Sequence, residues 1–455
     1  MEKLLKKPKV VEMTLVHPNA AGIDIGDSVH TVAVPVGRDV ESVRTFGAFT
    51  CDLEATIAWL TKCRVETVAL ESTGVYWKNL FNMLVQSGFE VYLVNARHTR
   101  NVTGKKTDES DAAWIQRLHS CGLLNSSFLP DDKTETLRTI VRHRRNLTRD
   151  SSICINRMQK SLELMNLKIH TVLNDITGKT GKAIVEAIIS GERNAVNFLP
   201  LIDKRVKASS DTICKSLQGN WRAEHLFLLK QSYTMYKFIQ EQIALCDGEI
   251  EAALQLMVAQ KRDGIIEKLS ITESSSVNVS KKKKTNKSHP AFNTREYLKR
   301  IHGTDVIEIY GISSTVALEV LGETGTDLSK WATEEKFVSW LNLCPNRKVS
   351  GGKLNSSKLL SKKVNLASQA FRMAANSLLS SNNWLGDYFR RMRAKGGHKY
   401  AIVATARKIT IIYYRMVRYK QAFTPFDYEE YKEKYRQTKI ANQERALKRL
   451  KDVAA

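Results

Sequence analysis

The first 125 residues alternate short apolar runs with amphipathic ones, and this order constrains the fold more than any other feature of the chain. Runs rich in β-branched residues predict strands, whereas apolar residues spaced three and four apart predict helices. The predicted order is three strands, a helix, a strand, a helix, a strand and a helix, at residues 20–27, 29–36, 42–49, 53–63, 66–70, 75–87, 89–95 and 108–121. Elements in this order form a mixed sheet flanked by helices, so we expect an α/β domain.

Two acidic residues occupy unusual places in this predicted sheet. Asp24 lies between Ile23 and Ile25 in an apolar strand, where an ionised carboxylate is costly unless it is paired or bound to a metal ion. Glu71 ends a short apolar strand, and open α/β sheets commonly place their ligand sites at the carboxyl ends of strands. Both residues are therefore candidates for a site at one edge of the sheet.

Two further acids, Asp108 and Asp111, open the last predicted helix. Because the two residues are three positions apart, both carboxylates point to one face of the first helical turn. The helix dipole favours their ionised forms there. Hard divalent ions such as Mg²⁺ prefer such oxygen-rich surroundings, although an ordinary acidic helix start is the alternative interpretation. If the first and fourth strands are neighbours and this helix packs across them, the four carboxylates converge and can hold two Mg²⁺ ions.

The charge of the chain indicates the class of partner. Its 455 residues carry a formal charge of +24, and such a surplus favours a polyanion, with nucleic acid as the default candidate. No apolar run approaches the ~18–20 residues that span a membrane, and the first residues lack the apolar core of a signal peptide. The seven cysteines form no Cys-x-x-Cys pair, which predicts reduced thiols, no zinc site and a cytoplasmic location.

The middle of the chain, residues 126–272, is predicted to be helical. It contains two long helices expected to pair as a coiled coil, either within the chain or across a dimer. Arg142, Arg144 and Arg145 on the first of them either follow a phosphate backbone or form a solvated basic face. Residues 273–290 are rich in lysine and poor in apolar residues, so we expect an exposed linker there.

Residues 291–425 are predicted to form a mainly α domain around a serine. Ser350 follows Lys348 and precedes Gly351, Gly352 and Lys353. Glycines let the backbone approach a phosphate, and cations stabilise the charge that develops on phosphorus. A serine hydroxyl still needs a base or a metal ion to become a nucleophile. A polar glycine-rich loop without chemistry is the alternative interpretation.

Other segments of this region also suit nucleic acid. The turn at Ile309–Ile312 resembles a helix-hairpin-helix, in which the glycine permits a close approach to phosphate. Arg390, Arg391 and Arg393 lie among aromatic residues, a pattern typical of nucleic-acid surfaces. Residues 426–455 are expected to form a charged helical tail.

One competing pattern occurs near the first strand. Residues 24–28 resemble the first phosphate loop of the actin and sugar-kinase ATPase fold, which shares the early strand order. That fold needs further glycine-rich loops, and no Gly-Gly pair occurs between residues 60 and 300. A long polyanion also suits the basic chain better than ATP does.

The acidic segments together resemble the DEDD-type insertion-sequence transposases, relatives of the Piv DNA invertase. The matching segments are Gly22–Gly26, Glu71–Trp77, Lys106–Ala112, Asp305–Ile312, Trp340–Pro345, Val349–Lys353, Leu385–Arg391 and Ala404–Lys408. This resemblance implies a RuvC/RNase H-like domain in residues 18–125, after a basic lead-in of residues 1–17, and a C-terminal transposase domain that contains the serine.

The resemblance implies a DNA transposase or site-specific recombinase of an insertion sequence. In the family pattern Asp24, Glu71, Asp108 and Asp111 bind Mg²⁺, for which Mn²⁺ can substitute, and Ser350 attacks a DNA phosphate to form a phosphoserine link. The implied partners are donor and target double-stranded DNA, a structured guide RNA that bridges them, and a homodimer that assembles to a tetramer on DNA. The implied setting is the bacterial cytoplasm, at the nucleoid when DNA is bound.

Two other functions remain as alternatives. A RuvC-like junction nuclease would hydrolyse DNA with water, so it would need Asp24 but not the Ser350 hydroxyl. A nucleic-acid-binding protein without chemistry would tolerate the change Asp108→Asn.

Overall fold

A computed structural model describes residues 15–95, 108–263, 289–360, 365–425 and 427–454. The chain divides into two compact units, Met1–Leu129 and Pro130–Ala455. Most of the basic lead-in and of the lysine-rich stretch, predicted at residues 1–17 and 273–290, lies outside the described residues. Within the described ranges, no helix is both long enough and apolar enough to cross a membrane.

The first unit is built on a five-stranded mixed sheet in the order β3-β2-β1-β4-β5. β1 is antiparallel to β2 and parallel to β4, β2 is antiparallel to β3, and β4 is parallel to β5. The strands are β1 (Ala20–Ile25), β2 (Val29–Ala33), β3 (Val43–Gly47), β4 (Thr67–Glu71) and β5 (Glu90–Val94). The predicted α/β domain is confirmed, and its first and fourth strands are neighbours.

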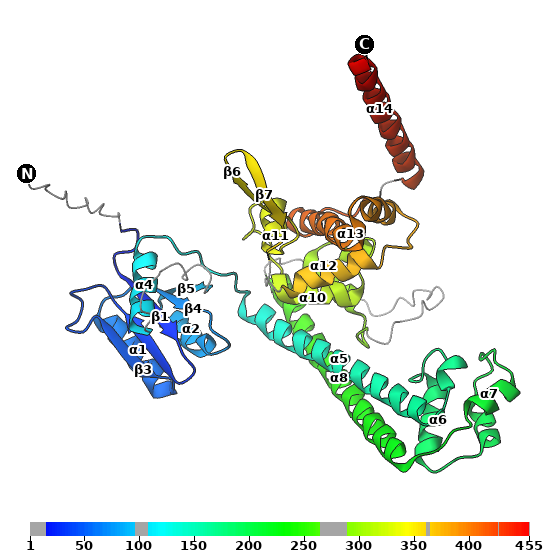
Figure 1. Cartoon of the computed structure of the whole chain (residues 1–455). Helices are drawn as coiled ribbons and strands as arrows, with labels where there is room; N and C mark the ends of the chain where they lie inside the picture. Colours follow the sequence, from blue (N-terminus) through cyan, green and yellow to red (C-terminus); the bar gives the residue numbers. More distant parts are fainter. Residues whose placement is uncertain (1–14, 96–107, 264–288, 361–364, 426, 455) are drawn as a thin grey trace, which may run out of the picture. The chain divides into compact units, whose positions relative to one another are not determined.

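Helices cover both faces of this sheet (Figure 1). On one face, α1 (Thr50–Lys62) and α2 (Trp77–Gln86) bury their leucines against a core that includes Ile23 and Leu70. On the other face, α4 (Asp108–Ser120) contributes Ile115 to a smaller cluster with Ala69 and Val94. Because successive strand residues point to opposite faces, the neighbours of Ile23 and Leu70 face α4.

Two long helices, α5 (Asp132–Leu164) and α8 (Ala223–Asp263), run side by side in the second unit (Figure 1). Arg144 pairs with Asp247 and Ser151 with Gln240, so the two helices are antiparallel and belong to one chain. Short elements connect them and share their apolar core: η1 (Ile169–Thr171), α6 (Lys179–Ile189), η2 (Ala195–Leu201) and α7 (Ser210–Ser216). Supercoiled packing of this pair stays a prediction.

The C-terminal part of the second unit is mainly helical, as expected. Its helices are α9 (Thr294–His302), η3 (Val306–Glu308), α10 (Ser314–Thr324), α11 (Glu334–Trp340), α12 (Leu366–Asn376), α13 (Trp384–Tyr419) and α14 (Tyr428–Ala454). α10 is buried from Val316 to Thr324 and packs against both α5 and α12. The exception to the helical pattern is a hairpin of β6 (Asn346–Ser350) and β7 (Lys353–Lys358).

Candidate active site

The parallel pairing of β1 with β4 places Asp24 beside Glu71. The register joins Ile23 to Leu70, so the next residues of the two strands lie at the same level, on strands about 4.8 Å apart. Ile23 and Leu70 point into the core under α1 and α2, and the two acids therefore point to the face that α4 covers. Both acids are half-buried at the carboxyl ends of their strands.

The position of α4 on this face depends on Gly22. A Cβ atom at Gly22 would lie 2.2 Å from the backbone nitrogen of Gln116 and 2.5 Å from the carbonyl oxygen of Ala112. The Gln116 side chain also donates to the Ala20 carbonyl oxygen at 3.2 Å. α4 thus runs antiparallel to β1 in direct contact with its backbone.

This contact brings the first turn of α4 to the acidic end of the strands. Asp24 lies two strand residues beyond Gly22, about 6.6 Å along the strand, and four helical residues back from Ala112 span about 6 Å. The helix therefore begins, at Asp108, near the level of Asp24. Asp111 lies in this first turn and is half-buried.

Three of the predicted metal ligands, Asp24, Glu71 and Asp111, are therefore placed at one end of one sheet face. Each of them makes a polar contact within the protein. The side chain of Asp108 lies outside the described residues. Among the side chains that are described, no group of three or more histidines, cysteines and acids is arranged to hold a metal ion. The four-carboxylate set stays a prediction.

Ser350 lies in the hairpin and not in a loose glycine-rich loop. It is the last residue of β6 and pairs with Lys353, the first of β7. Gly351 and Gly352 between them have φ of 55° and 76°, and positive φ at both central residues is the requirement of a two-residue type I′ turn. The hydroxyl-bearing residue is exposed, and so are its neighbours on both strands.

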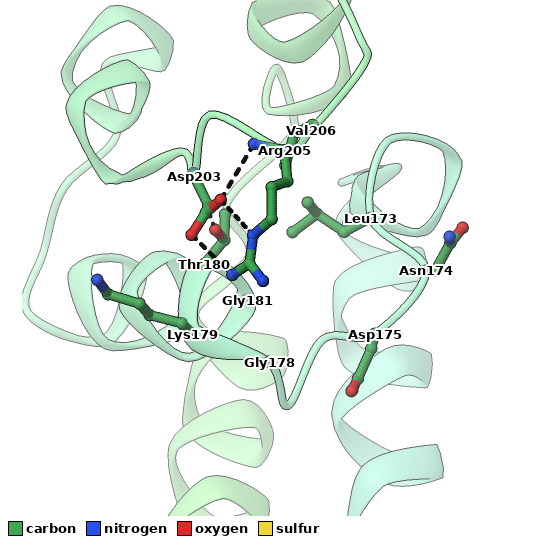
Figure 2. A pocket seen from close by; sticks show the side chains of 10 residues that line it. All are labelled: Leu173, Asn174, Asp175, Gly178, Lys179, Thr180, Gly181, Asp203, Arg205 and Val206. Carbon is green, nitrogen blue, oxygen red and sulfur yellow. Dashed lines mark hydrogen bonds and ion pairs between the residues drawn. The ribbon is translucent and has the colours of Figure 1, made fainter. Parts of the chain in front are cut away.

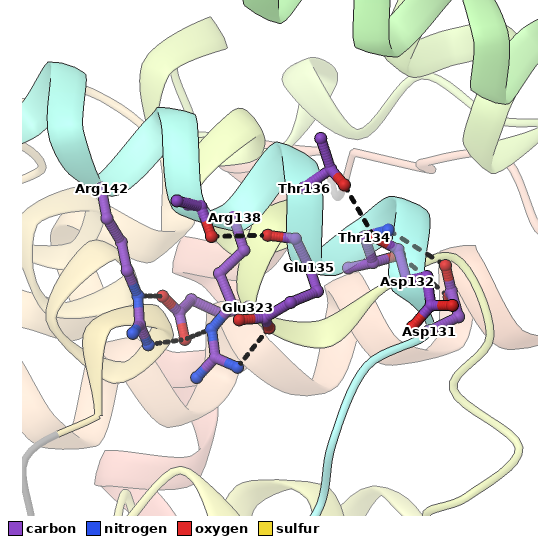
Figure 3. A network of polar contacts seen from close by, with 9 residues as sticks. Asp131, Asp132, Thr134, Glu135, Thr136, Arg138, Arg142 and Glu323 are labelled. Carbon is purple, nitrogen blue, oxygen red and sulfur yellow. Dashed lines mark hydrogen bonds and ion pairs between the residues drawn. The ribbon is translucent and has the colours of Figure 1, made fainter. Parts of the chain in front are cut away.

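The arginines of α5 contact carboxylates and amides of the protein. Arg142 donates from Nε and Nη2 to the two carboxylate oxygens of Glu323 on α10, at 2.7 and 2.9 Å (Figure 3). Arg144 is buried and pairs with Asp247 of α8. Arg145 donates to the side-chain oxygen of Gln369 at 2.8 Å. These side chains join α5 to α8, α10 and α12, and phosphate contact by the three arginines stays a prediction.

Two of the three predicted basic residues of α13 also contact other parts of the protein. Arg390 donates to the carbonyl oxygens of Leu379 and Ser381. The Arg391 guanidinium lies 3.9 Å from the ring centroid of Tyr435, and this contact fastens α14 to α13. Arg393 alone of the predicted three is exposed.

The turn at Ile309–Ile312 forms between η3 and α10, and Ser313 caps α10 by accepting from the Val316 backbone at 3.3 Å. Gly311 has φ of 89°, and a Cβ atom there would lie 2.5 Å from the Ala374 carbonyl oxygen. The close approach that this glycine permits in the structure is to α12, and a phosphate contact at the turn stays a prediction.

A pocket at the start of α6 contains an ion pair between two of the protein's own side chains. It encloses about 290 Å³ beside Gly178, Lys179 and Thr180 (Figure 2). The Thr180 hydroxyl accepts from the Asp203 backbone nitrogen at 3.0 Å, and the Asp203 carboxylate accepts from Arg205. Those contacts with Arg205 lower the pKa of Asp203, so an anion stays in the pocket.

Comparison with protein families adds two matches, one in each half of the chain. Residues 21–167 match the transposase family model DEDD_Tnp_IS110, and residues 304–390 match the model described as transposase IS116/IS110/IS902 family. The chain therefore carries both domains of an IS110-family transposase. A comparison with curated proteins finds no match to the chain.

The two matched regions contain the candidate catalytic residues. The first includes Asp24, Glu71, Asp108 and Asp111, and the second includes Ser350. These two transposase domains support a DNA-processing function in transposition and the binding of DNA. Sequence reasoning missed the hairpin and its last residue, Lys358, although the Gly-Gly pair between two polar runs was a signal for a tight turn.

Proposed function

We propose that this transposase exchanges DNA strands by transesterification, with Ser350 as the nucleophile and a Mg²⁺ site on the sheet of the first unit. The observation that carries the proposal is the register of β1 and β4, which sets Asp24 beside Glu71 beneath the first turn of α4. The family matches supply the class of reaction.

The residues present fit a magnesium site by their chemistry. Asp24, Glu71, Asp108 and Asp111 offer only carboxylate oxygens, the ligands that hard divalent ions prefer, and neither cysteine nor histidine belongs to the set. When bound there, Mg²⁺ or Mn²⁺ would activate an attacking oxygen and stabilise a leaving one. Two ions would suit four carboxylates.

In the proposed step, the Ser350 oxygen forms a bond to a DNA phosphorus while the bond from that phosphorus to a deoxyribose oxygen breaks. The serine hydroxyl gives up its proton, the released deoxyribose oxygen gains one, and the phosphate remains esterified to the serine. Attack by the freed hydroxyl of a second strand would reverse this step on new DNA. The energy of the phosphodiester is conserved, so no other co-reactant is needed.

We propose nucleic-acid partners that match the positive charge of the chain. The formal charge of +24 suits double-stranded donor and target DNA and a structured guide RNA that bridges them. Because strands are cut and rejoined in pairs, the active assembly is a homodimer that forms a tetramer on DNA. The setting is the bacterial cytoplasm, and the nucleoid when DNA is bound.

Three variants of the full chain test the proposal on DNA carrying the ends of its element, with Mg²⁺ and with RNA transcribed from the element. Asp24→Asn should abolish cleavage, because it removes a ligand charge at the site. Asp27→Asn is the matched control, since Asp27 is an exposed acid just beyond the same strand, and it should leave cleavage intact. Ser350→Ala should abolish both cleavage and the covalent protein–DNA adduct.

Other outcomes would decide against the proposal. If Ser350→Ala cleaves DNA while Asp24→Asn does not, the protein is a RuvC-like nuclease that uses water. If Asp24→Asn cleaves as well as Asp27→Asn, the acidic site has no part in the reaction.

A further inference from the structure

The β6–β7 hairpin carries cations that have no acidic partner. Arg347, Lys348, Lys353 and Lys358 lie on its two strands, and no acidic residue occurs between Glu335 and Asp387. In the described part of the chain, none of the four lies within salt-bridge distance of a carboxylate. Arg142, Arg144 and Arg145 of α5 and Arg390 and Arg391 of α13 have partners within the protein, whereas this hairpin presents uncompensated charge to solvent.

The register of the hairpin sorts these cations onto its two faces. Cross-strand partners share a face, and Ser350 pairs with Lys353, Lys348 with Ser356, and Asn346 with Lys358. Because alternate residues of a strand share a face, Ser350 lies with Lys348, and all three of the hairpin's lysines are on the serine's face. Arg347 falls on the opposite face.

A β-bulge determines the face of the hairpin on which the third lysine, Lys358, lies. The register shifts between Lys348 and Val349, so one extra residue stands in β7. In an unbroken ladder Asn346 would pair with Ser357, and Lys358 would point to the opposite face. The bulge thus turns Lys358 to the face of Ser350, where Lys353 and Lys348 already lie.

The opposite face has a different character. Val349 and Leu354 pair there beside Arg347, and they are 57% and 53% exposed. On the serine's face, alternate residues of one strand are about 6.6 Å apart, so the lysines form a line of charge that extends away from the hydroxyl. A line of cations beside a nucleophile suits a linear polyanion better than it suits a small anion.

We propose that the Ser350 face of the hairpin is the surface on which the phosphodiester backbone of the DNA strand to be cut lies, with Lys348, Lys353 and Lys358 as positioning residues. This inference rests on the proposed function, because it assigns the lysines to the strand that Ser350 attacks. Their contacts hold the phosphate chain along the hairpin, and Ser350 at the turn then meets one phosphorus.

The test measures binding of the full-length protein to a labelled DNA duplex carrying the end of its element, over a range of salt concentrations, with RNA from the element present. Each Lys→Gln change should reduce the slope of log affinity against log salt by about 0.9, the value of one phosphate contact on duplex DNA. The same changes should lower the yield of covalent adduct. A Lys→Arg change at each position should instead leave both the salt slope and the adduct yield at the level of the unchanged protein. Arg347→Gln is the matched control, since it removes a cation of the same hairpin from the other face.

The outcomes separate this inference from the proposed function. Ser350→Ala should abolish the adduct while leaving the salt slope unchanged, so an adduct that persists in that variant refutes the nucleophile and leaves the lysine result standing. If Arg347→Gln reduces the slope as much as the lysine changes do, the assignment to one face is wrong. If the three lysine changes together leave the slope and the adduct yield at the level of the unchanged protein, the inference is overturned.

Discussion

At the scale of single residues, Gly22 does most to place the acidic site. It lies two residues before Asp24 on the same face of β1, and the backbone of α4 occupies the space that a side chain would need. Its small size therefore sets how closely the helix that starts with Asp108 and Asp111 approaches the sheet. The packing of Gly22 against α4 thus affects the position of the acidic residues.

Substituting Gly22 by alanine should displace α4 and destabilise the first unit by about 1–3 kcal/mol, the usual cost of overpacking. The matched control is Gly248→Ala in α8, where a Cβ atom meets nothing within 4 Å and helix propensity gains up to about 1 kcal/mol. Thermal unfolding of both variants checks this. A Gly22→Ala protein as stable and as active as the Gly248→Ala protein would contradict the packing described for α4.

Buried His119 makes the stability of the first unit depend on pH. It is fully buried, 2.9 Å from the Thr67 hydroxyl through Nε2, and its ring lies against those of Tyr92 and His17. Burial, with a smaller contribution from His17, lowers its pKa from 6.5 to about 4. The unfolded chain therefore takes up a proton at a pH where the folded unit does not.

Stability from this residue should be present in full above pH 6.5 and should fall as the pH decreases towards 4, by an amount on the order of 3 kcal/mol. His119→Gln, which keeps a polar group beside Thr67 but cannot titrate, should flatten that part of the profile. Chemical denaturation at several pH values measures both. An unchanged profile in the variant would mean that other groups carry the acid sensitivity.

At the scale of elements, the strands and long helices followed from sequence pattern, whereas the hairpin did not. The apolar runs around Ile23 and Leu70 predicted two strands, and the structure contains both, paired in parallel. The hairpin has only Val349 and Leu354 as apolar residues on its two strands, so no periodicity marked it. The partners of the α5 arginines were also hidden, because Glu323 lies 181 residues from Arg142 in sequence. Acids inside the apolar helix α10 were the available signal.

The hairpin turn makes a prediction that separates local geometry from global stability. Gly352→Val should disrupt the turn, because a β-branched residue at positive φ costs about 1–3 kcal/mol. Gly351→Asn should be tolerated, since Asn-Gly is the preferred sequence of this turn. The expected result is loss of covalent adduct in the valine variant alone. Because both strands of the hairpin are exposed, the cost falls on local opening of the hairpin, and both proteins should unfold at the temperature of the unchanged chain. Equal adduct yields would show that the turn does not position Ser350.

At the scale of the whole molecule, the candidate chemistry is divided between two compact units. The acids belong to the first unit, Met1–Leu129, and Ser350 belongs to the second. The family matches fall on both halves, and residues 168–303 lie between them. The proposed reaction therefore requires that DNA bring an acidic site and a serine hairpin together, from one chain or from two copies.

The most direct test of this account is to trap the full-length protein on labelled DNA with Mg²⁺, digest the complex and identify the residue that carries the nucleotide. The account predicts a nucleotide on Ser350, in a peptide that disappears when Mg²⁺ is chelated or Asp24 is changed to Asn. A nucleotide on any other residue, or an adduct that forms equally well without the metal ion and without Asp24, would contradict it.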